Sequence, residues 1–324
     1  MSIKISKPAI ISSVVATERT GYRSWGIGIG GAMDFFAMSV ANFLVGNDRQ
    51  AVIEMGYSSS EIFVEQDLVI GVTGKGVELR VDEKIIPLWR PVTIKKNSLL
   101  KLLKKNDGAW AYLAVHGGWV AEEWLGSLTT NFSASKGGFQ GRVFHKNDVI
   151  ACFENSAGHQ LKILPWTISA QQLDEVYSPS HEIRCLPSVE TALLSEWSKQ
   201  KFTSEDFVIS PQSNRMGYRL SGPSLLLNQK LELVSSPVDA GMIQLLPDGN
   251  LITLMADCQT TGGYPRVASV IKADLPKLAQ CMPGEKIRFK MISLQEAEQQ
   301  GYSFQNQLAE LKRSCHLQFK NYFH

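Results

Sequence analysis

The alternation of apolar and polar residues predicts a chain built mainly from short β-strands. Val77, Leu79 and Val81 alternate with polar residues, and Asp82-Glu83 suits a tight turn between two paired strands. The spacing of strands and turns favours an antiparallel barrel or sandwich, because no regular strand-helix-strand rhythm is present. The clearest β-rich segments, each broken by turn residues, are 56–74, 76–105 and 108–119.

Two regions depart from this pattern and have helical periodicity. Asp34 is placed to cap a helix over residues 35–45, which carries apolar residues on one face and is followed by a glycine. Near the other end, residues 295–300 and 308–315 are helical in composition, and we expect an interruption around Gly301.

The length of the chain favours two lobes. At 324 residues it exceeds what one compact core usually covers. A segment rich in Ser and Pro between Pro165 and Pro187 is a suitable boundary. We therefore predict an N-terminal β-barrel lobe at 1–170 and a C-terminal β-barrel lobe with a helical tail at 171–324.

Composition limits the class of protein. Apolar residues make up 44% of the chain and charged residues 20%, which is typical of an ordinary globular protein. The net charge is only +2, and the basic residues are scattered, so we expect no nucleic-acid partner. The apolar stretches at the N-terminus are too short for a signal peptide or a membrane span, so we expect a cytoplasmic protein without a membrane partner.

Cysteine and histidine do not indicate a metal site. The five cysteines lie far apart, which predicts neither a disulfide framework nor a zinc site. His116, His145, His159 and His181 are not at the spacings of metal ligands, so we expect no metal. Cys258 follows an apolar strand, but nothing in the sequence locates a base beside it, and we interpret it as a packed thiol.

A glycine-rich stretch precedes the first predicted helix. Gly26, Gly28 and Gly31 match GxGxxG in form, but the residues before them are polar and turn-like, whereas a dinucleotide fingerprint needs a buried strand there. Gly30, Gly31 and Asp34 remain candidates for contact with a ligand or another subunit. Gly74-Lys75 lacks the spacing of a P-loop, so no ATP site of that kind is expected.

The densest polar chemistry lies in two segments of the second lobe. One places Arg215, Tyr218 and Arg219 near two glycines and offers donors for carboxylates or phosphates. In the other, a buried strand ending in Leu254 leads into a run of polar residues and glycines, the usual place for a site on a rigid scaffold, unless this is only a hydrogen-bonded turn. This run contains Asp257, Gln259, Thr260, Thr261, Gly262, Gly263 and Tyr264.

Three stretches resemble the signature segments of the biotin-dependent carboxyltransferase-like family. This family includes the C-type subunit of 5-oxoprolinase, the Kip antagonist proteins, allophanate hydrolase subunit 2 and a carboxyltransferase lobe of urea carboxylase. The resemblance covers residues 15–295 in similar order and spacing. The stretches are GYRSWGIGIGGAMDFFAMSVANFLVGN, SNRMGYRLSGPSL and LMADCQTTGGYPRVASVIKADLPKLAQCMPGEKIRF.

The resemblance implies a mainly β fold with two cyclophilin-like β-barrel lobes and a few peripheral helices. It implies an ATP-dependent 5-oxoprolinase that opens 5-oxoproline to L-glutamate. This chain would be one component of that hydrolase, inactive alone, with a Kip inhibitor-like B-type subunit and a LamB/YcsF-like A-type subunit as partners. The site would bind a small amide.

The candidate roles follow from this chemistry. Asp257 is the candidate base or orienting group, Arg215 the anchor of a carboxylate or phosphate, and Tyr218, Gln259 to Thr261 and Gly262 to Tyr264 the substrate lining. We expect Asp257→Asn and Arg215→Ala to abolish activity of the complex and leave folding largely intact.

Two other functions stay open. As the carboxyltransferase component of a urea carboxylase or allophanate system, the chain would need biotin from elsewhere, because it has no AMKM-like attachment tetrapeptide. As a Kip antagonist-like regulator, it would bind an inhibitor of a sensor kinase.

Two stretches depart from the family pattern. Residues 16–22 replace the usual entry to the first motif. Residues 125–142 keep LGS, GGF and GR but carry Thr129, Asn131 and Ser135 in place of a charged centre, which puts a different substrate or a regulatory role in view.

Overall fold

The computed structural model describes residues 2–153, 162–229 and 233–323. His159, one of the histidines considered as a metal ligand, lies outside these ranges. The chain divides into two compact units. The first unit comprises Met1–Arg19, Asp34–Gln172 and Asn306–His324, and the second comprises Thr20–Met33 and Leu173–Gln305.

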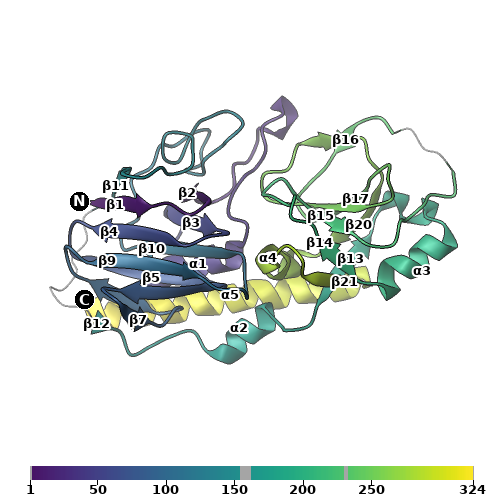
Figure 1. Ribbon diagram of the computed structural model, residues 1–324. Coiled ribbons are helices and arrows are strands. Elements are labelled where there is room, and N and C mark those ends of the chain that lie inside the picture. Colours follow the sequence, from purple (N-terminus) through teal and green to yellow (C-terminus); the bar gives the residue numbers. More distant parts are fainter. Residues whose placement is uncertain (1, 154–161, 230–232, 324) are drawn as a thin grey trace. The chain divides into compact units, whose positions relative to one another are not determined.

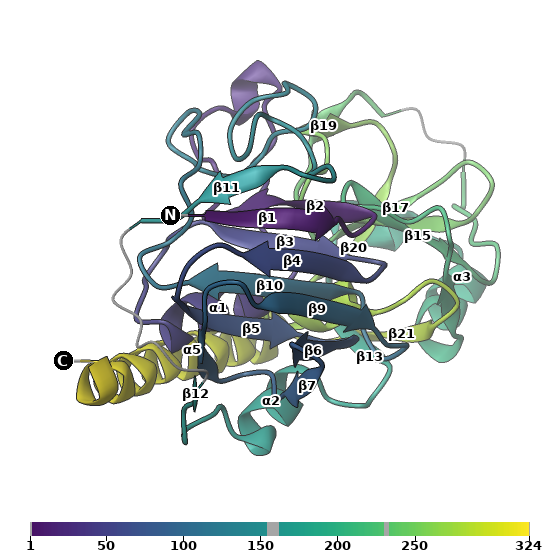
Figure 2. The ribbon, with the colours of Figure 1, turned by 60° about the vertical axis from the view of Figure 1, so that its left-hand side comes forward.

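The first unit consists of two six-stranded sheets (Figures 1 and 2). In order across the first sheet, the strands are β11 (Val149–Ala151), β1 (Ser2–Lys7), β4 (Ser60–Val64), β9 (Leu99–Lys104), β6 (Val77–Val81) and β7 (Lys84–Ile86). In order across the second sheet, they are β12 (Lys162–Ile163), β8 (Pro91–Ile94), β5 (Leu68–Gly74), β10 (Trp110–Val115), β3 (Val52–Gly56) and β2 (Ile11–Val15).

The hairpin of β6 and β7 has the turn that the sequence predicted. Asp82 and Glu83 connect the two strands, and both have positive φ angles, 47° and 66°. Two successive left-handed residues match the right-handed twist of the flanking strands, which is why two-residue hairpin turns favour this conformation. Val81 pairs with Lys84 directly across the turn.

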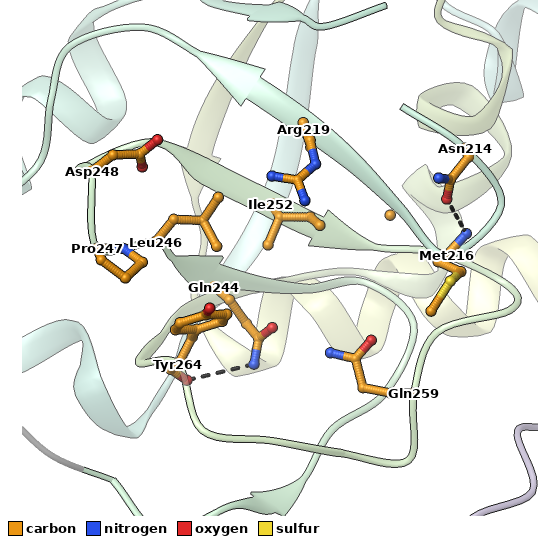
Figure 3. A pocket seen from close by; sticks show the side chains of 11 residues that line it. Asn214, Met216, Arg219, Gln244, Leu246, Pro247, Asp248, Ile252, Gln259 and Tyr264 are labelled. Carbon is orange, nitrogen blue, oxygen red and sulfur yellow. Dashed lines mark hydrogen bonds between the residues drawn. The ribbon is translucent and has the colours of Figure 1, made fainter. Parts of the chain in front are cut away.

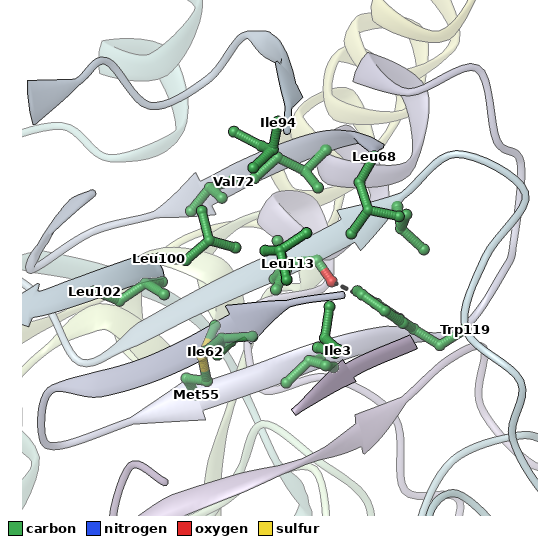
Figure 4. Packing of buried hydrophobic residues seen from close by; sticks show 14 of the residues in the cluster. Ile3, Met55, Ile62, Leu68, Val72, Ile94, Leu100, Leu102, Leu113 and Trp119 are labelled. Atoms are coloured by element: carbon green, nitrogen blue, oxygen red, sulfur yellow. Dashed lines mark hydrogen bonds between the residues drawn. The ribbon is translucent and has the colours of Figure 1, made fainter. Parts of the chain in front are cut away.

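Apolar side chains from both sheets form one continuous core in the first unit (Figure 4). Period-two alternation places Leu100 and Leu102 of β9 inward, and Ile62 of β4 joins them. Trp119 is buried in the same cluster, and its indole nitrogen donates to the Leu113 carbonyl at 3.0 Å, so its one polar group is satisfied.

Helix α1 (Phe35–Leu44) lies against strands β5 and β10 of the first unit (Figure 1). Asp34 caps it as predicted, since its carboxylate accepts from the backbone N–H of Ala37 at 2.9 Å. The Tyr112 hydroxyl on β10 accepts from the Asp34 N–H at 2.7 Å, and the Thr73 hydroxyl on β5 donates to the Ala37 carbonyl. The helix is therefore fixed to the sheet by hydrogen bonds as well as by apolar packing.

A closed barrel forms the second unit, and the prediction of a mainly β protein is confirmed. All neighbouring strands are antiparallel except β13 and β21, which are parallel. In order around the barrel, the strands are β13 (Glu182–Pro187), β20 (Arg266–Val270), β17 (Met242–Leu245), β18 (Leu251–Leu254), β15 (Gly217–Ser221), β14 (Phe207–Ile209) and β21 (Lys286–Met291). A separate ribbon pairs β16 (Ser236–Pro237) with β19 (Thr261–Gly262).

Short helices complete the fold, and α3 packs on β21 of the barrel (Figure 1). They are α2 (Ala170–Val176), α3 (Glu196–Ser204), α4 (Leu275–Gln280) and the 3₁₀ turns η1 (Arg23–Trp25), η2 (Val189–Leu193) and η3 (Lys272–Asp274). None of the helices in the described part of the chain is both long and apolar enough to cross a membrane.

The C-terminal helix is continuous, so the predicted interruption around Gly301 is wrong. Helix α5 (Leu294–Phe323) passes through this glycine without a break. A single glycine inside a helix costs only about 1 kcal/mol, and the buried face that Leu311, Cys315 and Phe319 form in the first unit outweighs it. The low helix propensity of one glycine therefore does not end a helix that is held by such a face.

Gly71 on β5 allows α1 to lie close to the sheet. A methyl group there would lie 2.9 Å from the Ala41 carbonyl oxygen and 3.2 Å from Leu44 Cβ. We therefore expect Gly71→Ala to lower the free energy of unfolding by about 1–3 kcal/mol through overpacking. Thermal and urea unfolding followed by circular dichroism measure this change.

The matched control is Gly301→Ala, because nothing lies within 4 Å of a methyl group at this helical position. It should raise stability by about 0.5–1 kcal/mol. Equal stability of Gly71→Ala and the wild type would contradict the close approach of α1 and β5.

Candidate functional site

Three segments far apart in the sequence meet in the second unit at the side chain of Arg215. Its Nε donates to Asp257 Oδ2 at 2.6 Å, and its Nη2 donates to Asp257 Oδ1 at 3.0 Å. Nη2 also donates to the Gly31 carbonyl at 2.7 Å. Only 5% of Arg215 is exposed. All three signature stretches therefore contribute to one buried hydrogen-bonded cluster.

The two strands that carry this pair place it by backbone geometry. Arg215 lies in the turn that leads into β15, where Asn214 and Gly217 exchange backbone hydrogen bonds. Asp257 lies in the turn that follows β18, and its N–H donates to the Arg215 carbonyl at 2.9 Å. Because β15 and β18 are paired, the ends of these strands bring both turns together.

The glycine-rich stretch packs on the same turns. A methyl group at Gly28 would lie 3.1 Å from the Cys258 carbonyl oxygen, so the backbone approaches closely there. Gly30 and Gly31 have positive φ angles, 62° and 97°, which residues with a side chain rarely adopt. The 3₁₀ turn η1, not a strand, precedes these glycines, in agreement with the argument against a dinucleotide fingerprint.

The ion pair changes the interpretation of Asp257. Both of its oxygens already accept hydrogen bonds from one guanidinium, which fixes the carboxylate against Arg215. Asp257 suits the role of orienting Arg215 better than that of a general base. Arg215 in turn donates its hydrogen bonds to Asp257 and Gly31, so fewer of its N–H groups are available to anchor a substrate.

A cavity of about 490 Å³ opens beside this cluster, on the outer face of the barrel in the second unit (Figure 3). Two of the predicted binding residues, Gln259 and Tyr264, line it. The other polar side chains of its wall come from Asn214, Arg219, Gln244 and Asp248.

The remaining predicted binding residues lie elsewhere. Tyr218 is 0% exposed, and its hydroxyl donates to the Ala279 carbonyl at 2.8 Å, so the prediction that it contacts substrate does not fit its position in the barrel core. Thr260 is buried, and its carbonyl accepts from the Val238 N–H. Thr261 and Gly262 pair with β16 in the small ribbon, and Gly263 follows them.

Asp34 and the altered loop have structural roles in the first unit. Asp34 is fully buried as the cap of α1. The Thr129 hydroxyl accepts from the Ala16 N–H at 2.9 Å, and the Asn131 side chain accepts from the Ala134 N–H at 2.8 Å. The residues that replace the charged centre of this loop therefore hold its backbone.

The sequence indicated Arg219 as a possible donor without giving it a role in the site, and it gave no indication of Gln244 or Asp248. Alternation along β15 carried the missing signal, because Tyr218 and Leu220 point into the barrel and Arg219 between them must point outward. The position of Gln244 could not be found in this way, since it depends on which strands become neighbours in the barrel.

Cys258 is a packed thiol, as predicted. It is buried with Val238 and Leu254, and this burial raises its pKa from 9.0 to about 12. No cluster of three metal-binding side chains occurs in the ranges that the structure describes.

Comparison with known proteins identifies the family. A family model described as carboxyltransferase domain, subdomain A and B, matches residues 25–291. The chain is 36% identical over 282 residues to the C subunit of 5-oxoprolinase from Haemophilus influenzae, covering 86% of this chain and 87% of that protein. It is 34% identical over 296 residues to the C subunit of 5-oxoprolinase from Escherichia coli, with 91% and 93% covered.

A solved structure shows the same fold. The crystal structure of K. lactis urea amidolyase superposes with a TM-score of 0.87 at 24% identity, over 96% of this chain. The chain spans only 20% of the amidolyase chain. The protein belongs to the carboxyltransferase domain family.

Removal of the Asp257 charge should destabilise the second unit, which revises the expectation of intact folding. Breaking a buried pair leaves a buried cation without its partner and costs about 3–5 kcal/mol. We expect Asp257→Asn to lower the free energy of unfolding by about 3 kcal/mol, measured by urea denaturation.

The matched control is Asp206→Asn, which breaks the more exposed pair with Arg288 on the same barrel. Such pairs contribute about 0–1 kcal/mol. If both variants lose the same stability, the Arg215–Asp257 pair does not hold the segments together.

Cys258 should react slowly with alkylating agents in the folded protein. A pKa of about 12 in place of 9.0 lowers the thiolate fraction at neutral pH by about a thousandfold. Iodoacetamide labelling at pH 7.5, followed by peptide mass spectrometry, should show at least a hundredfold slower reaction than in urea, allowing for transient opening. Equal rates in the two states would contradict this burial.

Proposed function

We propose that this chain is the C-type subunit of an ATP-dependent 5-oxoprolinase, which opens 5-oxoproline to L-glutamate together with A- and B-type subunits. The observation that carries the proposal is the identity of 34–36% to two 5-oxoprolinase C subunits over nearly the full length of each. The gathering of all three signature stretches around Arg215 supports it, because a shared site needs those stretches together.

The chemistry explains why such an enzyme needs ATP. A five-membered lactam is a resonance-stabilised amide, so its carbonyl carbon is a poor electrophile. Transfer of the γ-phosphoryl group of ATP to the lactam oxygen makes that carbon electrophilic. Water then adds, the carbon–nitrogen bond breaks, and the nitrogen takes up a proton to become the amino group of glutamate. A second water releases the phosphate, and ADP leaves.

This chain suits the binding of the small substrate better than the binding of ATP. A triphosphate needs several cations or a cradle of backbone N–H groups. The polar wall of the cavity offers one guanidinium, Arg219, together with the carboxylate of Asp248. We therefore assign ATP to the partners, for which Kip inhibitor-like B-type and LamB/YcsF-like A-type subunits are the candidates, all working in the cytoplasm.

The second candidate function is carboxyl transfer from biotin to a urea-like acceptor. The carboxyltransferase description of the family model favours it. Biotin would come from a separate carrier protein, since the chain has no attachment tetrapeptide. A Kip antagonist-like role in binding a kinase inhibitor is the third candidate, and a phosphorylation assay with that inhibitor and its kinase tests it.

Reconstitution of the complex tests the proposed function. The purified chain alone should release no glutamate from 5-oxoproline, because neither ATP binding nor a complete site is expected in it. A mixture with the A- and B-type subunits should release glutamate only when ATP is present, with one ADP formed per glutamate. Enzymatic glutamate determination and chromatography of nucleotides measure both products.

Omission of each component in turn is the control. Full activity without this chain would exclude a catalytic or assembly role. Transfer of the labelled carboxylate from a carboxylated biotin carrier protein to urea, with release of the free biotin form, would instead favour carboxyl transfer.

A further inference from the structure

The outer face of the barrel carries a row of residues from three neighbouring strands. Arg219 on β15 pairs across the sheet with Ile252 on β18, and Ile252 pairs with Gln244 on β17. Residues in such a row point to the same side of the sheet. Together they form the floor of the 490 Å³ cavity (Figure 3).

The guanidinium of Arg219 faces this cavity, where Asp248 on the same wall attracts it electrostatically without forming an ion pair with it. No hydrogen bond or ion pair of its side chain occurs within residues 2–153, 162–229 and 233–323. The nearby Arg215 and Arg266 are each held by a carboxylate, Asp257 and Glu190 respectively. Arg219 therefore has its fork of donors available for a carboxylate from a ligand.

Gln244 supplies a buried amide at the same place. Only 1% of this residue is exposed, and its carboxamide nitrogen donates to the Tyr264 carbonyl over a long 3.5 Å. A methyl group at Gly262 would lie 2.7 Å from that nitrogen, so the glycine leaves room for the carboxamide. A buried carboxamide with one long hydrogen bond can still pair with an amide of a ligand. Gln259 offers a second carboxamide on the same wall.

Asp248 limits which anions the cavity accepts. Its carboxylate accepts from the side-chain and backbone N–H groups of Asn250 at 2.9 and 3.0 Å, and these hydrogen bonds lower its pKa. Asp248 is therefore ionised at neutral pH. Its negative charge disfavours a ligand that carries more negative charge than Arg219 alone can neutralise. A ligand with a single carboxylate suits this wall better than a phosphate dianion does.

We propose that this cavity binds a small monocarboxylate that also carries an amide. Arg219 takes the carboxylate, and the carboxamides of Gln244 and Gln259 pair with the amide. The cavity volume lies within the usual range of about 300–1,000 Å³ for small-molecule sites. The inference deepens the proposed function, on which it rests only for the choice of 5-oxoproline as the first ligand.

Isothermal titration calorimetry with the full chain tests this site. The four probes are 5-oxoproline, 2-pyrrolidinone without the carboxylate, cyclopentanecarboxylate without the amide, and inorganic phosphate. We expect 5-oxoproline to bind about tenfold or more tightly than each of the other three, because only it satisfies both groups.

Variants of the cavity wall assign the binding to these residues. Arg219→Met should weaken 5-oxoproline binding by about ten- to a hundredfold, Gln244→Leu should weaken it by a similar factor, and Arg219→Lys should lie in between. Arg219 is exposed, so circular dichroism should show an unchanged fold for its variants. The matched control is Arg313→Met, which removes an exposed arginine on α5 and should bind like the wild type.

The outcomes separate this inference from the proposed function. Wild-type affinity in Arg219→Met, or tighter binding of phosphate than of 5-oxoproline, overturns the cavity assignment. N-acetylglycine, an acyclic amide with one carboxylate, serves as a fifth probe. If it binds in an Arg219-dependent way and 5-oxoproline does not, the cavity assignment stands with another ligand of this class, and glutamate release by the reconstituted complex decides the 5-oxoprolinase function separately. If neither binds, the cavity assignment fails whatever the reconstituted complex does.

Discussion

A buried guanidinium is the constraint on which the polar part of the second unit depends. Arg215 cannot lose its charge in a protein, and a buried cation without partners would cost several kcal/mol. It is satisfied by both oxygens of Asp257 and by the Gly31 carbonyl. These acceptors come from segments more than 180 residues apart in the sequence, so the charge can be buried only where the segments meet.

Two arginines at strand β15 differ in role, because Arg215 is held by this buried ion pair and Arg219 is not. Arg215 lies in the turn before β15 and holds the backbone segments together. Four residues later, Arg219 lies on the outer face with its donors directed to the cavity, while Tyr218 between them points into the core. Two arginines in one short motif thus have opposite roles, because one faces a fixed carboxylate and the other faces an open cavity.

Local patterns in the sequence were sufficient for the strands, for the turn at Asp82-Glu83 and for the Asp34 cap, because each depends on neighbours within a few residues. The composition of the site was only partly predictable. Gln259 and Tyr264 do line the cavity, but Tyr218 is a core residue and Gln244 was missed. Which residues share a wall depends on strand pairing across the barrel, for instance Ile252 with Gln244, and this pairing is not visible in a single sequence.

The proposed ligand chemistry of the cavity would allow it to distinguish one amide from another. Urea and a lactam both present an N–H beside a carbonyl, so a carboxamide such as that of Gln244 can pair with either. Only 5-oxoproline adds a carboxylate. On the proposed ligand chemistry, Gln244 therefore recognises what the two substrates share, and Arg219 recognises what distinguishes them. Arg219 then discriminates between 5-oxoproline and a urea-like ligand, because the urea-like ligand brings no carboxylate to pair with its guanidinium.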